Sequence, residues 1–296
     1  MYQIRHHKAA HILEIENKAS AISAKIQLNE GASLQEYTFN NLLIIKNLEP
    51  LSYQNTYASA ILFPFANRIK DGNYTFNGKT YQFPINQKEE NNALHGLIFN
   101  KTFKISETEA LVDTASVTLE YTEKGDSQGF PYPYHVSIKY TFTKTGLSLS
   151  FSAKNTSNEA FPFTVGWHPY FASENLYEST LQFDSSNKLI IGDRNIGTGI
   201  KANDTPEGFQ IKDQQLDDCW VLNQDKVVFT TPQYKLQCSS NVEGNFLQAY
   251  TPPLENIIAI EPTTGVSNSF NNKIGLQVLD PGNTYNIAWN LKINHI

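Results

Sequence analysis

A histidine within an aromatic-rich segment is the first residue of this sequence that could carry acid–base chemistry. His168 lies in the segment AFPFTVGWHPYF, residues 160–171, directly before Pro169. Because proline fixes its own φ and biases the preceding residue toward extended backbone, Pro169 should hold His168 on a rigid strand end or turn. The segment is equally consistent with a core strand whose histidine is hydrogen-bonded and idle. We expect the imidazole to be surrounded by the aromatic side chains of Phe161, Phe163, Trp167, Tyr170 and Phe171.

A carboxylate after an apolar run is the second candidate. Glu261 directly follows Ile257-Ile258-Ala259-Ile260 and precedes Pro262. The run predicts a buried strand that carries Glu261 to its end, where we expect Pro262 to stop the hydrogen-bonded ladder. A buried carboxylate is costly unless it is paired or used in chemistry, which favours a functional role for Glu261.

Other polar side chains lie in short motifs that suit a ligand site. Arg68, in FPFANRIKDG, follows an apolar run, where a guanidinium could bind a polar ligand at a cavity wall or simply lie at the surface. His95 precedes Gly96 in NNALHGL, where glycine permits a turn or a close approach, although a loop histidine without chemistry is the alternative. Asp217 and Asp218 open the apolar segment LDDCWVL, as a pair of turn acids or as strand residues with one facing inward.

Several catalytic motifs are missing from the chain. His6, His7 and His11 have no further ligands at suitable spacing and the H-E-x-x-H pattern is absent, so we expect no catalytic metal. The pair Gly197-x-Gly199 lacks the third glycine and the strand–helix context of a dinucleotide-binding loop. No Walker sequence and no G-x-S-x-G nucleophile turn occur.

The elements that must position these residues are strands rather than long helices. Apolar and polar residues alternate on both sides of the turn at 144–146, which predicts an antiparallel hairpin with one buried face. Asn77-Gly78 suits the positive φ values of a two-residue hairpin turn. Residues 280–282, Asp-Pro-Gly, predict a turn before a final strand at 285–293.

Further strands are expected at 11–16 and 42–45, and the Asn/Asp/Gly-rich region 192–208 is expected to be a long loop or excursion. No linker-like tract or internal repeat interrupts the chain. We therefore predict an all-β fold, one large and mainly antiparallel domain over residues 1–296.

The composition supports this fold and limits the partners. The 296 residues include 15 Tyr, 18 Phe and 3 Trp, and 40% are hydrophobic, which is enough for a large core. The formal net charge of −6 argues against nucleic acid or an anionic membrane as a partner, because both require basic surface. Arginine occurs three times, at Arg5, Arg68 and Arg194, which weighs against phosphate recognition.

Cysteine usage and the N-terminus indicate the compartment. Cys219 and Cys238 have a spacing that fits neither a zinc site nor a disulfide framework, so we expect two thiols in or near the core. The N-terminal segment lacks the apolar run of a signal peptide, and no stretch approaches the ~18 apolar residues of a membrane span. We expect a soluble, cytoplasmic protein.

Taken in order, five of these segments resemble the motifs of the aldose 1-epimerase (galactose mutarotase) family. The segments are NRIKDG, LHG, GWHPYF, LDDCW and IEPTTGVSNSFNN, and the resemblance runs from about Asn67 to the C-terminal strand. Each motif alone is weak, but five in the right order make the assignment specific. Leu97, Pro169 and the Pro-Thr-Thr after Glu261 depart from the best-known pattern, as in a less characterised bacterial branch, and leave the preferred sugar open.

The resemblance implies a role for each candidate residue. His168 becomes the general acid and Glu261 the general base, and their reference pKa values of about 6.5 and 4.3 suit these roles. Arg68, His95 and Asp217 would bind the sugar, with His95 near the ring oxygen. The family's fold is a large β-sandwich, similar to a supersandwich, with the site in an open cleft on one sheet. We expect the imidazole and the carboxylate to face one open hollow, about a pyranose-width apart.

The implied reaction interconverts the α and β anomers of a free hexose and requires no cofactor. The substrate would be a monosaccharide, and the protein a monomer or homodimer. A hexose-6-phosphate 1-epimerase is the nearest alternative, although it needs a phosphate pocket that three arginines do not favour. A non-catalytic carbohydrate-binding protein and a glycosidase that uses Asp217 and Glu261 are further alternatives.

Overall fold

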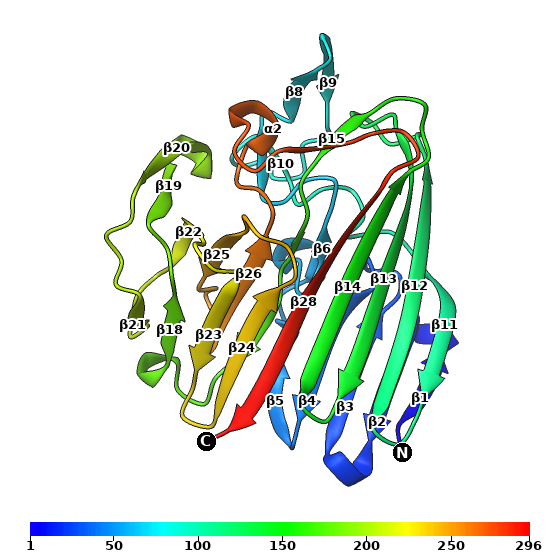
Figure 1. Cartoon of the computed structure of the whole chain (residues 1–296), viewed down its shortest axis with the longest axis vertical. Helices are drawn as coiled ribbons and strands as arrows, with labels where there is room; N and C mark the ends of the chain where they lie inside the picture. The colour runs from blue at the N-terminus through cyan, green and yellow to red at the C-terminus, as the bar shows by residue number, and fades with distance from the viewer.

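Strands account for most of the computed structural model, which describes residues 1–296 (Figure 1). A 13-stranded sheet contains, in spatial order, β1 (Gln3–His7), β2 (Ile12–Asn17), β3 (Ile22–Gln27), β4 (Ser33–Phe39), β5 (Leu42–Ile45), β17 (Tyr170–Ala172), β26 (Ile257–Thr263), β25 (Phe246–Tyr250), β22 (Asp217–Val221), β19 (Asn187–Ile191) and β20 (Gly197–Ala202). Its remaining two strands, β16 (Gly166–Trp167) and β6 (Ile61–Leu62), pair beside β26.

A 9-stranded antiparallel sheet forms the second layer. Its order is β11 (Lys104–Ala110), β12 (Thr114–Lys124), β13 (Pro133–Thr143), β14 (Gly146–Asn155), β28 (Thr284–His295), β24 (Tyr234–Ser240), β23 (Lys226–Thr230), β18 (Thr180–Phe183) and β21 (Gly208–Gln210). Three small ribbons pair β7 (Arg68–Lys70) with β10 (Asn92–Leu94), β8 (Asn73–Phe76) with β9 (Lys79–Gln82), and β15 (Phe161–Phe163) with β27 (Gln277–Leu279).

Helical structure is limited to single turns. The α-helices are α1 (Tyr53–Thr56) and α2 (Ser269–Asn272), and the 3₁₀ turns are η1 (Lys8–Ala10), η2 (Lys18–Ser20), η3 (Leu176–Glu178) and η4 (Asp193–Asn195). No helix of the structure has the length and apolar character that crossing a membrane requires.

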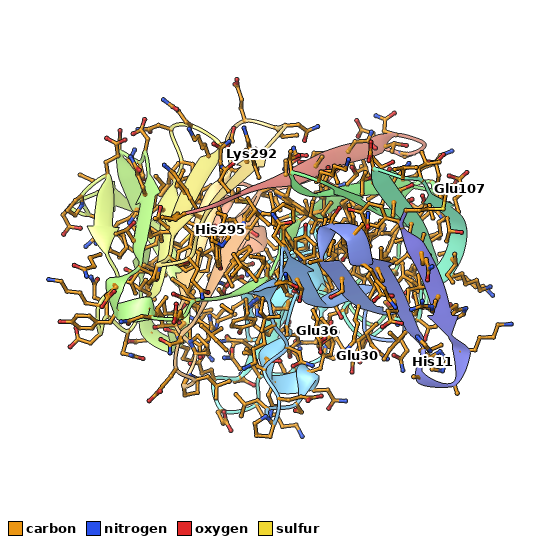
Figure 2. The ribbon with its side chains drawn as sticks, turned by 90° about the horizontal axis from the view of Figure 1, so that it is seen from below. His11, Glu30, Glu36, Glu107, Lys292 and His295 are labelled. Atoms are coloured by element: carbon orange, nitrogen blue, oxygen red, sulfur yellow. The ribbon has the colours of Figure 1, made fainter.

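Aromatic side chains from both large sheets meet in the space between them. Trp167 of β16 lies 6.4 Å from Trp289 of β28, measured between ring centroids, and Tyr37 of β4 lies 5.8 Å from Phe142 of β13. These rings belong to one hydrophobic cluster of 63 buried residues that both sheets supply. Side chains fill the interior in the view of Figure 2, and Glu107 lies on β11 at the edge. The two sheets and their shared core confirm the predicted β-sandwich.

The turn residues predicted the hairpins correctly. β13 and β14 pair antiparallel with Thr143 opposite Gly146, and the alternate side chains of β13 are buried. Asn77 and Gly78 join β8 to β9 with φ values of 48° and 74°, as the two-residue turn requires. The strands expected at 11–16, 42–45 and 285–293 correspond to β2, β5 and β28.

The region 192–208 was wrongly expected to be a loop, because it contains the strand β20, which pairs with β19. Most of β20 is exposed, so it lacks the apolar alternation by which a strand is recognised. As an edge strand it needs partners on only one side. Cys219 and Cys238 are both buried free thiols, as predicted.

Candidate active site

A pocket of about 310 Å³ contains all five candidate residues, Arg68, His95, His168, Asp217 and Glu261. It lies on the face of the 13-stranded sheet that points away from the shared core. Strand alternation shows this on β26, where Ile258 and Ile260 enter the main core and Glu261, the next residue, lines the pocket. Segments far apart in the sequence therefore converge at the centre of this sheet.

His168 occupies the two-residue gap between β16 and β17. Its backbone N–H donates to the carbonyl of Ala60 at 3.0 Å, and its carbonyl accepts from the N–H of Ser59 at 2.8 Å. These bonds fix the backbone at the point where Pro169 already restricts it. His168 is therefore held on a rigid strand end, as its sequence context predicted.

The aromatic surroundings of His168 differ from the expectation. Its ring lies 4.9 Å from that of Tyr170 and 5.1 Å from that of His95. The other four aromatic residues of the segment belong to the main core cluster, because successive residues of a strand face opposite sides of the sheet. They are Phe161, Phe163, Trp167 and Phe171.

Glu261 lies on a central strand, and Pro262 does not end that strand. β26 continues through Pro262 to Thr263. Ile260 donates to Pro169 at 3.4 Å and Thr264 donates to Val165 at 2.8 Å. Pro262 lies between these two residues and faces the same neighbouring strands, at the point where the partner of β26 changes from β17 to β16. Because proline has no N–H, the ladder loses one hydrogen bond there and then continues.

His168 Nε2 and Glu261 Oε1 are 3.4 Å apart, closer than the pyranose-width separation that we expected. Strand pairing explains the short distance, because β26 pairs with both β16 and β17 and His168 lies between those two strands. Only 3% of Glu261 and 5% of His168 is exposed, which places both groups at the bottom of the pocket.

Burial moves the two pKa values in opposite directions. Desolvation raises the pKa of Glu261 well above its usual value, Asp217 adds to this effect and Arg68 opposes it. Desolvation also lowers the pKa of His168 to about 4. Burial therefore favours the neutral form of each group, a carboxylic acid beside a neutral imidazole. The reference values had predicted a protonated His168, and loss of water from both groups reverses this order.

His95 packs against the catalytic candidates from β10. The residue adopts a positive φ of 62° just after the strand, and its ring lies 4.7 Å from that of Tyr57. Burial first, then the nearby His168 and Arg68, hold the pKa of His95 well below its usual value. The Nδ1 atoms of His95 and His168 have no hydrogen-bond partner in the protein.

A row of hydrogen bonds connects Asp217 to Arg68. Gln248 Nε2 donates to Asp217 Oδ1 at 2.7 Å, and Asn67 Nδ2 donates to Gln248 Oε1 at 3.5 Å. Arg68 Nη1 then donates to Asn67 Oδ1 at 3.1 Å. Asp217 lines the pocket and Asp218 does not, which agrees with the expectation that neighbouring strand residues face opposite ways.

Sequence reasoning missed other lining residues, including Tyr57, Gln87, Asn195 and Gln248. Gln248 could have been found, because it is a polar residue between apolar ones in FLQAY and lies directly opposite Glu261 in the sheet. Asn195 lies on the turn η4, and no local pattern indicates that this turn reaches the pocket.

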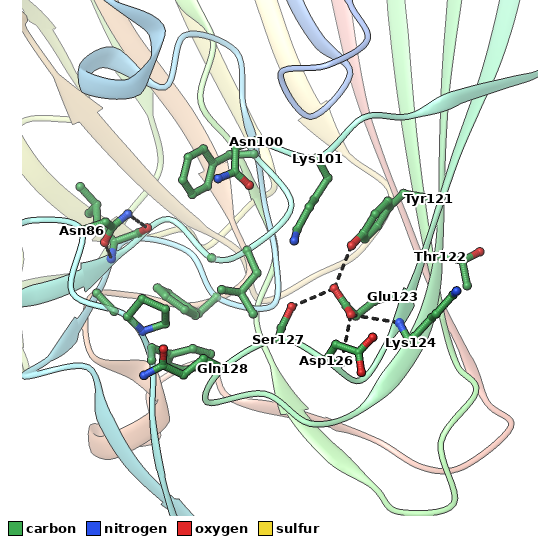
Figure 3. Close-up of a pocket in the computed structure, with 18 residues that line it drawn as sticks. Asn86, Asn100, Lys101, Tyr121, Thr122, Glu123, Lys124, Asp126, Ser127 and Gln128 are labelled. Atoms are coloured by element: carbon green, nitrogen blue, oxygen red, sulfur yellow. Dashed lines mark hydrogen bonds between the residues drawn. The ribbon is translucent and has the colours of Figure 1, made fainter.

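A larger cavity of about 540 Å³, drawn in Figure 3, lies beside this pocket. Leu94 contributes to the lining of both. Its buried carboxylate, Glu123, accepts hydrogen bonds from four neighbours drawn in Figure 3. None of the candidate residues lines this cavity. No group of three or more His, Cys, Asp or Glu side chains in the structure is arranged to hold a metal ion.

Comparisons with known proteins identify the family and the fold. The family model described as aldose 1-epimerase matches residues 11–292. The YihR protein of Escherichia coli is 26% identical over 273 residues, which cover 88% of this chain and 87% of that protein. Mouse galactose mutarotase is 27% identical over 160 residues, 52% of this chain and 45% of that enzyme.

The fold comparison extends over the whole chain. The crystal structure of a galactose mutarotase-like protein from Clostridium acetobutylicum has a TM-score of 0.88 at 20% identity, and the match covers 100% of this chain and 99% of that one. At this identity the match supports the fold alone.

Proposed function

The chain belongs to the aldose 1-epimerase family, and from this premise we propose that it interconverts the α and β anomers of a free hexose. The observation that carries the proposal is the 3.4 Å approach of His168 Nε2 to Glu261 Oε1 at the bottom of a pocket. Arg68, His95 and Asp217 line the same pocket and would bind the sugar hydroxyl groups.

The reaction needs one proton donor and one proton acceptor. Glu261 removes the proton from the anomeric hydroxyl while His168 protonates the ring oxygen, and the bond between that oxygen and the anomeric carbon breaks. The resulting aldehyde turns about its C1–C2 bond, and the ring closes on the other face as both protons return. No proton is gained or lost overall. No electrons and no phosphoryl group are transferred, so the proposed reaction requires no cofactor.

The reactive form of the pair is a proton-transfer isomer of the neutral form that burial favours. A carboxylate beside an imidazolium holds the same number of protons as a carboxylic acid beside an imidazole. Moving one proton over the short distance between the two groups therefore prepares both the base and the acid. Arg68 favours this ionic form, because its positive charge acts to lower the pKa of Glu261.

The dimensions and charge of the pocket suit a neutral monosaccharide. Its volume of about 310 Å³ lies at the small end of the usual range for ligand sites. Arg68 is the only lysine or arginine in the lining, and Asp217 contributes a carboxylate. A phosphorylated hexose would need more positive charge, so we favour the free sugar over a hexose 6-phosphate. One chain supplies the whole site, as a monomer or in a homodimer.

Polarimetry tests the proposal directly. Catalytic amounts of the protein should accelerate the optical-rotation decay of freshly dissolved α-glucose or α-galactose. We expect His168→Gln to lower the rate by ~10²–10⁴, the usual contribution of a positioned acid–base group. Sugar binding without any acceleration by the unaltered protein would instead favour a carbohydrate-binding role.

A further inference from the structure

Glu90 contacts two residues that line the pocket but does not line it itself. We propose that Glu90 is a positioning residue that sets the charge selectivity of the site, by engaging Arg68 so that an anionic sugar cannot. This inference rests on the proposed function. It adds a residue outside the family-like motifs and assigns to it the exclusion of sugars that carry a phosphate or a carboxylate.

The contacts of Arg68 show what Glu90 does. Arg68 Nε donates to Glu90 Oε2 at 3.2 Å and to Gln87 Oε1 at 3.1 Å. Nη1 donates to Asn67 Oδ1 at 3.1 Å, whereas Nη2 has no hydrogen-bond acceptor in the protein. Arginine captures phosphates and carboxylates through two parallel N–H groups on one edge. With Nε already engaged, the Nε–Nη2 edge can offer an anion only one of its two nitrogens.

Glu90 is itself held firmly from the opposite side. Its Oε1 accepts a hydrogen bond from Asn195 Nδ2 at 2.9 Å. Asn195 lies in η4 and lines the pocket. Arg194 in the same turn pairs with Asp71 Oδ1 at 2.9 Å, which ties η4 to the segment after β7. One carboxylate therefore joins two walls of the pocket, and η4 cannot shift without breaking its contact with Glu90.

The charges around the pocket add to the geometric effect. Arg68 and Glu90 neutralise each other, and both are largely shielded, with side-chain exposures of 14% and 28%. Arg68 is the only lysine or arginine in the lining, and Asp217 adds a carboxyl group to it. An entering phosphate or carboxylate meets repulsion, whereas a neutral hydroxyl group still finds Nη2 as a hydrogen-bond donor.

Glu90→Gln tests the proposal, because it removes the charge and preserves the size of the side chain. The matched control is Glu89→Gln, since Glu89 is the exposed neighbouring residue and the same charge is lost. The rate of anomer exchange would be measured for glucose, glucose 6-phosphate and glucuronate. For Glu90→Gln we expect kcat/KM for the two anionic sugars, relative to glucose, to rise about tenfold, mainly through a lower KM. Glu89→Gln should change this ratio less than about twofold.

A second measurement needs no variant. Added salt screens repulsion between charges, so KM of the unaltered protein for glucose 6-phosphate should fall as salt increases, while KM for glucose stays constant. Equal ratios in the two variants, or a KM for glucose 6-phosphate that does not fall with salt, would overturn the inference and leave the mutarotase proposal intact. An unaltered protein that prefers glucose 6-phosphate to glucose would overturn both the inference and the choice of a free hexose as substrate. If no sugar is turned over at all, the proposed function fails, and the inference that rests on it fails too.

Discussion

Glu123 and Glu261 are two buried carboxyl groups in adjoining cavities, and their surroundings shift their pKa values in opposite directions. Glu123 is 5% exposed and Glu261 is 3% exposed, so burial does not distinguish them. Glu123 accepts hydrogen bonds from Tyr121 Oη and Ser127 Oγ at 2.8 Å each, and from two backbone N–H groups (Figure 3). The Glu261 side chain accepts no hydrogen bond from the protein, and Nε2 of His168 lies 3.4 Å from its Oε1.

The pKa shifts follow these donors. Desolvation acts to raise the pKa of Glu123, but hydrogen bonds from Tyr121 and Ser127 and the charge of Lys101 outweigh it, so the pKa is lowered. At Glu261 desolvation prevails and the pKa is raised. A buried carboxylate that is saturated with donors is a structural element. One that is left almost without donors retains the capacity to exchange a proton, which is what catalysis requires.

The largest expected effect separates the two glutamates by activity. Glu261→Gln should lower the rate of anomer exchange by ~10²–10⁴, because it removes the base, and Glu123→Gln should leave the rate within a few-fold of the unaltered protein. Polarimetry on freshly dissolved α-glucose provides the measurement. If both variants lost activity equally, the distinction between a structural and a catalytic carboxylate would fail.

The pH dependence of activity tests whether the pair works with one proton. Below about pH 4 His168 also gains a proton, so no base remains, and kcat should fall about tenfold for each further pH unit. The acid limb should therefore lie well below the value of 6.5 expected for an ordinary histidine. An acid limb at pH 6 to 7 would show that His168 is not desolvated in the working enzyme.

The two glutamine variants should rank in the opposite order when stability is measured in place of activity. Glu123→Gln places an amide N–H₂ group among hydrogen-bond donors, and we expect it to lower the free energy of unfolding by about 2–3 kcal/mol at pH 7. Glu261→Gln removes a carboxylate that resists ionisation and should not destabilise the fold at that pH. Urea denaturation of both variants measures the difference, and a less stable Glu261→Gln would contradict this account.

Much of this site was predictable from the sequence, for a physical reason. The turn residues Asn77-Gly78 and the alternation of apolar and polar residues over 135–143 are local features of the sequence, so they predict the hairpins. His168 and Glu261 could be singled out because each places an ionisable group in a largely apolar stretch of the sequence.

Other features depend on contacts between distant segments. The effect of Pro262 follows from which neighbouring strand its missing N–H faces, and the separation of His168 from Glu261 follows from strand pairing. Glu90 lies in an acidic turn whose sequence contains no sign of Arg68 or Asn195. The strand β20 was not predicted, because an exposed edge strand does not need an apolar face.

The smallest effect we expect is the pH dependence of stability, which differs in sign between the two glutamates. The folded pKa of Glu261 is raised, so its contribution is fully present below its unfolded value of about 4.3 and is lost as pH rises towards the folded pKa. The folded pKa of Glu123 is lowered, so its contribution is present above about 4.3 and is lost as pH falls through the folded pKa. A tenfold difference in proton affinity between the folded and unfolded states corresponds to about 1.4 kcal/mol of stability.

Unfolding free energies of the unaltered protein and both glutamine variants, measured between pH 3 and pH 8, resolve the two contributions. Relative to the unaltered protein, Glu261→Gln should gain stability as pH rises above about 4.3, because it lacks the carboxylate whose ionisation the fold resists. The penalty of Glu123→Gln should shrink as pH falls below about 4.3, because the unaltered protein then loses the favourable carboxylate as well. Parallel curves for the two variants would mean that both carboxylates sense the same environment, and the contrast in their hydrogen-bond donors would then have no energetic consequence.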